Sequence, residues 1–273
     1  MSRQPKQLGS PVVIQFVKNM RSITWSEGQH GAKDFIIEGD NLERPVTGAI
    51  WLSNSQSKKI SLVLCGHGAS GDRYQEPIPY LARQLGSLDD TAILSIDGPV
   101  HGLRMIAPGG REAFFKEMQN PNFIDHMVRD WTIAYETVVS EYDFKPEKLG
   151  YFGLSMGTMF GIPLLASNLN FDTAVIGLCG SSGAASLIGT RLLEDAAKIS
   201  HPTFFIMQLE DELFDREGYL ALFDALGAED KRLHANPGLH PEVPTEEIDF
   251  SIDFLNQHLT KRNQKREIKP LSE

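Results

Sequence analysis

A serine held between two glycines is the first feature of this sequence that could do chemistry. Residues 151–161 read YFGLSMGTMFG, which places Ser155 between Gly153 and Gly157. An apolar run precedes the serine, and apolar residues at helical spacing follow it. A strand that turns abruptly into a helix would present the hydroxyl on the bend, as a nucleophile requires. In a chain with this many glycines, the motif alone is weak evidence for a nucleophile. The alternative is a plain strand–helix turn in which the serine caps the helix.

A second glycine-rich turn follows another apolar run, in the stretch LVLCGHGASGD. Together the two turns resemble the nucleophile elbow and the oxyanion turn of the α/β-hydrolase superfamily. The resemblance implies that Ser155 is the nucleophile and that the N–H groups of Ala69 and Met156 stabilise the oxyanion. His67 is interpreted as a side chain that braces this turn. The alternative to an oxyanion-binding turn is an ordinary glycine-rich turn.

A serine is a poor nucleophile until a base takes its proton, and four histidines follow Ser155. In the superfamily the acid and then the histidine come after the nucleophile. His240 lies in NPGLHPEVP, a predicted loop between the last strand and the last helix, from which an imidazole can reach the serine. His201 precedes the strand expected to carry the acid, His234 lies in a strand-like segment, and His258 lies on the last helix. We therefore expect His240 to be the base.

The acid is expected just after the strand-like run HPTFFIMQL, where the sequence reads EDELFD. This stretch offers Glu210, Asp211, Glu212 and Asp215. Asp211 matches the superfamily pattern best, because an apolar residue follows it at the expected distance. Asp215 stays open as the alternative, since it occupies a place where the family often has proline. The acid would fix the tautomer of the imidazole and stabilise its protonated form.

The elements around these residues alternate between strands and helices. Apolar runs lie at 60–66, 91–98, 148–155, 173–180 and 202–209. Runs that are apolar throughout are typical of parallel strands covered on both faces. Earlier strand candidates, separated by turn-rich stretches typical of hairpins, are Val12–Val17, Asp34–Glu38 and Val46–Ser53. We predict an α/β fold with a mostly parallel central sheet, helices on both faces and antiparallel N-terminal strands, as in the α/β-hydrolases.

Two stretches carry apolar residues at helical spacing. The first is Phe123, Met127, Trp131, Ala134, Tyr135 and Val138, and the second is Ile248, Ile252, Leu255 and Leu259. Residues 1–260 are predicted to form a single domain, and residues 261–273 a polar tail.

Only two short segments, 102–121 and 181–200, are predicted to cover the site. The chain thus resembles compact members of the superfamily, such as dienelactone-hydrolase-like esterases and the catalytic domains of prolyl-oligopeptidase-type peptidases. An apolar wall for the substrate is expected from Leu103, Met105, Phe114, Phe115, Leu213 and Phe214. The resemblance implies a serine esterase that cleaves esters of small to medium acyl chain through an acyl-enzyme. A peptidase or amidase, a perhydrolase or lyase, and a non-catalytic binding protein remain alternatives.

The net charge and the hydrophobicity of the chain limit the kinds of partner that we expect it to bind. The net charge is −10, with no concentrated basic face, so we expect no nucleic-acid partner. No stretch approaches the roughly 20 apolar residues that cross a bilayer, and the N-terminal apolar run is too short for a signal sequence. A small-molecule ester is the expected partner, and a homodimer is left open.

Cofactors and disulfides are not expected. The histidines lack metal-ligand spacing such as H-x-x-x-H, so we expect no metal and no cofactor. The resemblance puts one strand between those of Cys65 and Cys179, about 10 Å apart against a disulfide reach of about 7 Å. Two buried thiols without an export signal indicate a cytoplasmic protein.

Overall fold

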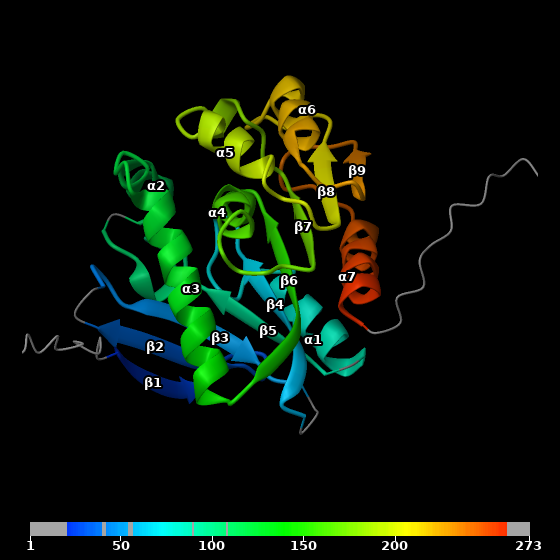
Figure 1. Cartoon of the computed structure of the whole chain (residues 1–273). Coiled ribbons are helices and arrows are strands. Elements are labelled where there is room, and N and C mark those ends of the chain that lie inside the picture. Colours follow the sequence, from blue (N-terminus) through cyan, green and yellow to red (C-terminus); the bar gives the residue numbers. More distant parts are fainter. Residues whose placement is uncertain (1–20, 40–41, 54–56, 89, 108, 261–273) are drawn as a thin grey trace, which may run out of the picture.

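One mixed sheet organises the part of the chain that is described. The computed structural model describes residues 21–39, 42–53, 57–88, 90–107 and 109–260. Within them the strand order is β1-β2-β3-β5-β4-β6-β7-β8-β9 (Figure 1). The strand expected at Val12–Val17 and the polar tail expected at 261–273 lie outside the described residues.

The strands fall into two groups. They are β1 (Arg21–Glu27), β2 (Lys33–Gly39), β3 (Val46–Trp51), β4 (Lys59–Gly66), β5 (Thr91–Ile96), β6 (Lys145–Leu154), β7 (Thr173–Gly177), β8 (Thr203–Gln208) and β9 (Lys231–Asn236). The first three pair in antiparallel fashion, and β3 joins β5 in the same way. From β5 through β9 every pairing is parallel. The predicted fold class is confirmed, although β1 was not among the predicted strands.

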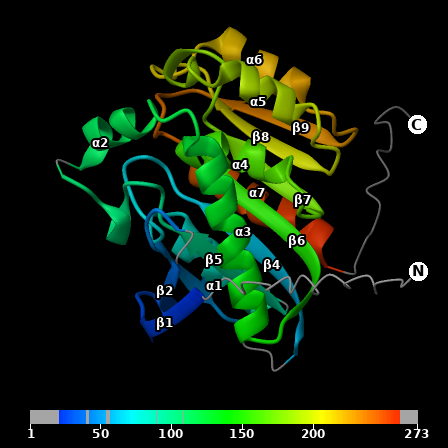
Figure 2. The ribbon, with the colours of Figure 1, turned by 60° about the vertical axis from the view of Figure 1, so that its left-hand side comes forward.

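Helices cover both faces of the sheet, as Figures 1 and 2 show. They are α1 (Ile78–Leu88), α2 (Gly110–Glu117), α3 (Phe123–Glu141), α4 (Met156–Leu165), α5 (Gly189–Ala196), α6 (Arg216–Ala225) and α7 (Thr245–Leu259), with short 3₁₀ turns η1 (Gly102–Arg104) and η2 (Gly183–Ala185). Helices α1 and α7 pack on one face, and α3 and α4 pack on the other, with α5 beside α4 and α6 beside α5. None of these helices combines the length and the apolar character that a membrane span requires.

Both predicted helical stripes face the core. Helix α3 buries Phe123, Met127, Trp131, Ala134 and Val138, while Tyr135 is partly buried against the same core. Helix α7 buries the other stripe, consisting of Ile248, Ile252, Leu255 and Leu259. The burial of these residues on opposite faces of the sheet supplies the apolar area that holds the three layers together.

The parallel strands bring the chemically interesting residues to one edge. Ser155 follows β6, Asp211 lies just beyond β8, and His240 lies beyond β9. The turn with Ala69 follows β4. The carboxyl ends of parallel strands lie along the same edge of a sheet, where α/β proteins place their ligand sites. Residues more than 170 positions apart in sequence therefore meet there.

A buried guanidinium ties the N-terminal hairpin to this edge. Arg73 follows the Ala69 turn, and its side chain is 7% exposed. It lies 2.8 Å from a carboxylate oxygen of Asp34 on β2 and 3.0 Å from one of Asp97, whose side chain is fully buried. Asp97 also accepts hydrogen bonds from the Thr47 hydroxyl and from the backbone N–H of Leu103. The hairpin and the loops beyond β4 and β5 are thus joined by one buried charge network.

Replacing Arg73 with methionine should leave Asp97 buried without its counter-charge. We expect a loss of about 3–5 kcal/mol in the free energy of unfolding, measured by urea denaturation. The matched control is Arg21→Met, because Arg21 makes only a surface ion pair with Glu136 at 3.5 Å. That change should lower the free energy of unfolding by less than about 1 kcal/mol. Equal losses in the two variants would contradict the structural role assigned to Arg73.

Candidate active site

Ser155 occupies a strained bend between β6 and α4. Its backbone has φ 57° and ψ −120°, in a region that non-glycine residues rarely adopt. The chain can adopt this bend because the glycines on either side of it lack side chains. A Cβ at Gly157 would lie 2.5 Å from the carbonyl oxygen of Gly66, and a Cβ at Gly153 would lie 2.8 Å from the ring of Tyr151. Such backbone conformations cost about 1–3 kcal/mol, and they persist only where the surroundings hold them.

Buried hydroxyl groups hold the bend in place. The Thr158 hydroxyl lies 2.8 Å from the carbonyl oxygen of Gly153 and 2.6 Å from that of Gly177, and it accepts the N–H of Gly177 at 2.8 Å. The Tyr151 hydroxyl donates to the carbonyl oxygen of Gly157 at 2.6 Å. The N–H of Ser155 itself donates to Gly177 at 2.9 Å. The turn is therefore fixed to β6 and to the end of β7.

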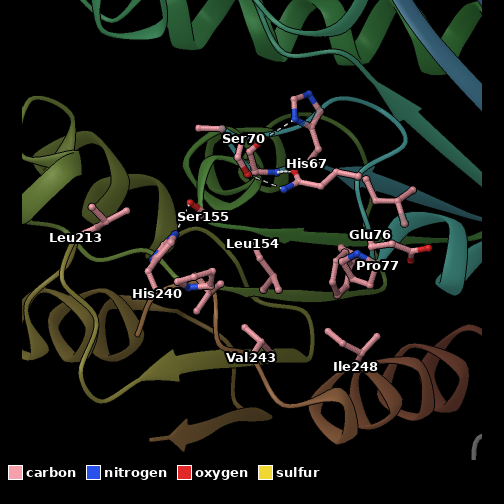
Figure 3. A pocket seen from close by; sticks show the side chains of 18 residues that line it. His67, Ser70, Glu76, Pro77, Leu154, Ser155, Leu213, His240, Val243 and Ile248 are labelled. Carbon is pink, nitrogen blue, oxygen red and sulfur yellow. Dashed lines mark hydrogen bonds between the residues drawn. The ribbon is translucent and has the colours of Figure 1, made fainter. Parts of the chain in front are cut away.

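His240 connects this serine to a carboxylate. Its Nε2 lies 2.9 Å from Ser155 Oγ (Figure 3). Its Nδ1 lies 2.7 Å from Asp211 Oδ2. The imidazole is 12% exposed and the Asp211 side chain is 1% exposed. With the Nδ1 proton donated to the carboxylate, Nε2 is free to accept the proton of the serine hydroxyl.

The structure separates the two candidate acids. Asp211 accepts the N–H groups of Leu213 and Phe214 at 2.7 and 3.0 Å, and it also accepts the Tyr219 hydroxyl. Burial alone would raise the pKa of Asp211, but the hydrogen bonds from His240, Tyr219 and the backbone outweigh it and lower that pKa. A carboxylate held in this way stays ionised beside the imidazole.

Asp215 has a different position. It is the N-cap of α6, and its carboxylate accepts the N–H of Gly218 at 2.7 Å. Its second oxygen accepts the Ser182 hydroxyl at 2.6 Å. Asp215 therefore begins a helix, and Asp211 is the carboxylate that contacts His240.

The turn after β4 is braced from several sides. Gln75 accepts the N–H of Gly68 at 2.8 Å, and the ring of His101 lies 3.1 Å from the carbonyl oxygen of Ala69. His67 accepts the N–H of Gly98 at 2.8 Å. Burial lowers the pKa of His67 to about 4, so its ring is neutral and structural. These contacts leave the N–H of Ala69 without an acceptor among the described residues.

The N–H of Met156 is also available, because this residue begins α4 and its amide has no partner within the helix. Met156 directly follows the serine, and Ala69 lines the same cavity as the serine, so both N–H groups are candidate donors at this site. Two such donors beside a nucleophile are what an oxyanion needs.

A cavity of about 330 Å³ opens beside Ser155 and His240. Its lining includes three polar side chains, those of Ser70, Gln75 and Glu76. Most of the rest is apolar and comes from Phe152, Leu154, Leu178, Leu213, Val243, Ile248, Pro77 and Ile78. Figure 3 shows Val243 and Ile248 on one side of the cavity and Pro77 on another, with Leu154 between them and the serine. The cavity therefore runs from the serine to the starts of α1 and α7.

Comparison with solved structures places this chain in a family. A cold-adapted esterase from an Arctic intertidal metagenomic library is 32% identical to it, with a TM-score of 0.74. The comparison covers 87% of this chain and all of that one. The chain belongs to the esterases of the α/β-hydrolase superfamily.

More distant structures share the fold of this esterase. An acetyl xylan esterase from Paenibacillus sp. R4 is 15% identical, with a TM-score of 0.67 over 88% of this chain and 89% of that one. An acylaminoacyl peptidase from Pyrococcus horikoshii is 14% identical, with a TM-score of 0.66 over 87% of this chain and 42% of that one. No family model and no curated protein matches the sequence.

Most of the apolar wall expected from the sequence lies elsewhere in this esterase. Of the six residues, only Leu213 lines the cavity. Leu103, Met105 and Phe115 are 58%, 67% and 55% exposed. Phe114 is buried against His101 and Phe160, and Phe214 is buried with its ring 5.7 Å from that of His240. Leu103 lies in η1, Met105 directly follows it, and Phe114 and Phe115 lie in α2, which projects from the body in Figure 2.

Several residues of the site were not predicted. Tyr219 and Gln75 brace Asp211 and the Ala69 turn, while Val243 and Leu154 form part of the cavity. Tyr219, Gln75 and Val243 lie outside the motifs, and the type of residue at 154 is not part of the motif around Ser155, so no sequence signal identified these four.

The remaining expectations concern metals and thiols. Within the described residues, no group of three or more His, Cys, Asp or Glu side chains could hold a metal ion. Cys65 and Cys179 are buried free thiols, and burial raises the pKa of both.

Tyr219→Phe should destabilise the esterase in a pH-dependent way. The folded-state pKa of Asp211 is lowered, so this carboxylate stabilises the fold above its unfolded pKa of about 4 and stops doing so as the pH falls through the lower folded value. Loss of the hydroxyl should remove about 1.5–3 kcal/mol of unfolding free energy at pH 7. The difference from the wild type should shrink below about pH 4, which denaturant titrations at several pH values would measure. A difference that is equal at pH 7 and pH 3 would contradict this assignment.

Proposed function

We propose that this protein is a serine hydrolase that cleaves carboxylic esters through an acyl-enzyme. The observation that carries the proposal is the continuous chain of hydrogen bonds from Ser155 through His240 to the buried carboxylate of Asp211. The similarity to the Arctic esterase supports the ester as the scissile group.

In the first half of the reaction, Ser155 Oγ attacks the carbonyl carbon of the ester as its proton passes to Nε2 of His240. The carbonyl electrons move onto the oxygen, and the N–H groups of Ala69 and Met156 stabilise the resulting oxyanion. Asp211 stabilises the imidazolium and keeps the ring oriented. When the intermediate collapses, the bond to the alcohol breaks and the alcohol oxygen takes the proton from Nε2.

The second half repeats these steps with water. Nε2 of His240 takes a proton from the water, and the hydroxide attacks the acyl carbon bound to Ser155 Oγ. A second oxyanion forms in the same position. Its collapse returns the proton to Ser155 and releases the acid, which restores the enzyme.

The size of the cavity supports a substrate with a small to medium acyl chain. A volume of about 330 Å³ lies at the low end of the range for ligand pockets, which is roughly 300–1,000 Å³. Its apolar lining suits an aliphatic chain, and its small volume limits the length of that chain.

Two experiments test the function. A fluorophosphonate should label the wild-type protein and leave Ser155→Ala unlabelled, whereas a non-catalytic binding protein would stay unlabelled throughout. A panel of p-nitrophenyl esters from acetyl to decanoyl, run beside peptide amides, then separates an esterase from a peptidase. Turnover of amides without turnover of any ester would overturn the proposal.

The two candidate acids give a prediction of their own. Asp211→Asn should lower kcat by about 10⁴, because the amide N–H can donate to Nδ1 of His240 and so favour the tautomer in which Nε2 carries the proton and cannot act as a base. Asp215→Asn should leave kcat near the wild-type value, since the new side chain still caps α6 with an oxygen. Steady-state kinetics on p-nitrophenyl butyrate would measure both. A comparable loss in Asp215→Asn would reverse the assignment.

The lining of the cavity at the start of α7 gives a prediction about chain length. Ile248→Ala should enlarge the cavity and shift the preferred acyl chain toward longer esters. Each additional methylene that becomes buried should raise kcat/KM by about fourfold, which corresponds to about 0.8 kcal/mol. The control is Leu103→Ala, because Leu103 is exposed and does not line the cavity. If Leu103→Ala shifts the profile and Ile248→Ala does not, the substrate chain lies along η1 instead.

A further inference from the structure

Two short segments carry the acid and the base. We call residues 208–213 the acid turn and residues 236–242 the histidine loop. Their backbones are already joined, since the N–H of Leu209 donates to Asn236 at 2.8 Å and that of Glu210 donates to Gly238 at 3.2 Å. The histidine loop has no regular secondary structure beyond Asn236, so its remaining polar backbone groups need other partners.

Gln208 supplies partners for the carbonyl groups of the histidine loop. Its side chain is 1% exposed at the end of β8. The amide nitrogen lies 2.8 Å from the carbonyl oxygen of Glu242, and 3.3 and 3.4 Å from those of Pro237 and Leu239. An amide has two protons, so Gln208 bonds two of these three oxygens at a time. One buried side chain of the acid turn thus fixes both ends of the histidine loop.

Three glutamates supply partners for the N–H groups of the same loop. The N–H of Gly238 donates to Glu210, and the N–H of Leu239 donates to Glu242 at 2.7 Å. The N–H of His240 donates to Glu212 at 3.0 Å. Successive N–H groups of this loop therefore have one carboxylate each, and two of those carboxylates come from the acid turn.

These carboxylates have no competing role in the described structure. None of the three forms an ion pair with a lysine or arginine there, and none belongs to a group that could hold a metal ion. With Asp211 they place four acidic side chains around one loop, an arrangement that like-charge repulsion disfavours. Their hydrogen bonds to the loop are the interactions that offset this repulsion.

We infer that Gln208 and Glu212 are positioning residues that hold the imidazole of His240 in line between Asp211 and Ser155. This inference rests on the proposed function. Through these two side chains the acid turn and the histidine loop form one unit, so the Nε2–Oγ distance is set by β8 and its turn. Neither residue lines the cavity, so we expect their loss to act mainly on the geometry of proton transfer.

The test uses four variants of the full chain. Glu212→Ala removes the acceptor of the His240 N–H, whereas Glu212→Gln keeps an oxygen there. Gln208→Met keeps the shape of the side chain and removes its donors. Glu246→Ala is the control, because Glu246 is an exposed carboxylate in the first turn of α7 and makes none of these contacts.

The expected result is a selective loss in kcat. Glu212→Ala and Gln208→Met should lower kcat by about 10–10²-fold with little change in KM, the size of effect that a misplacement of about 1 Å produces. The rate of fluorophosphonate labelling of Ser155 should fall in parallel. Glu212→Gln should recover most of kcat, and Glu246→Ala should match the wild type.

Other results would overturn the inference. These are an unchanged kcat in Glu212→Ala, a loss that appears only in KM, or an equal loss in Glu212→Gln and Glu212→Ala. If Gln208→Met does not fold, as circular dichroism would show, the exposed Glu212 pair decides the question alone. Absence of ester turnover in the wild type would instead count against the proposed function, which keeps the two failures distinct.

Discussion

The close approach of α4 to the end of β4 is the constraint on which the active site depends. Gly157 and Gly66 are in direct backbone contact, and a Cβ on either would meet a neighbour at 2.4–2.5 Å. This contact forces the chain to reverse within one residue, which is why Ser155 has a positive φ. The same contact holds the start of α4 against the end of β4, which the Ala69 turn follows. A single packing contact therefore bears on Ser155 and on both turns that carry the proposed oxyanion donors.

The rest of the site is held by buried polar groups rather than by apolar packing. Arg73 and Asp97 fix the loops beyond β4 and β5, while Tyr219 and two backbone N–H groups fix Asp211. In a low-dielectric interior such networks are strong when every member has a partner, and they specify one geometry. The reacting groups are thus preorganised before the substrate arrives, which is the main source of electrostatic stabilisation in an active site.

The fold could be predicted well where a segment is apolar throughout or carries a stripe of apolar residues. Apolar runs identified β4 to β8, and the stripes on α3 and α7 identified their buried faces. Ser155, His240 and Asp211 could be proposed because short motifs and chain order single them out. Strand β1 escaped notice because it is a polar edge strand, with no fully buried residue. The cavity wall was misplaced because Met105 and Phe115 look like core residues in sequence, and only tertiary packing shows that they are exposed.

The two functions of the site are carried by different parts of the fold. Ser155, Asp211 and His240 follow the ends of β6, β8 and β9 in the parallel part of one sheet, so their relative positions are coupled through its backbone. The cavity wall comes from the first turns of α1 and α7 and from the segment around Val243, which the sheet constrains less directly. Changes at Val243 or Ile248 alter the shape available to an acyl chain without disturbing the serine bend. The acid turn and the histidine loop separate these regions, since Gln208 anchors the loop to the sheet before the chain reaches Val243. Substrate preference in this esterase can therefore vary while the geometry of proton transfer stays constant.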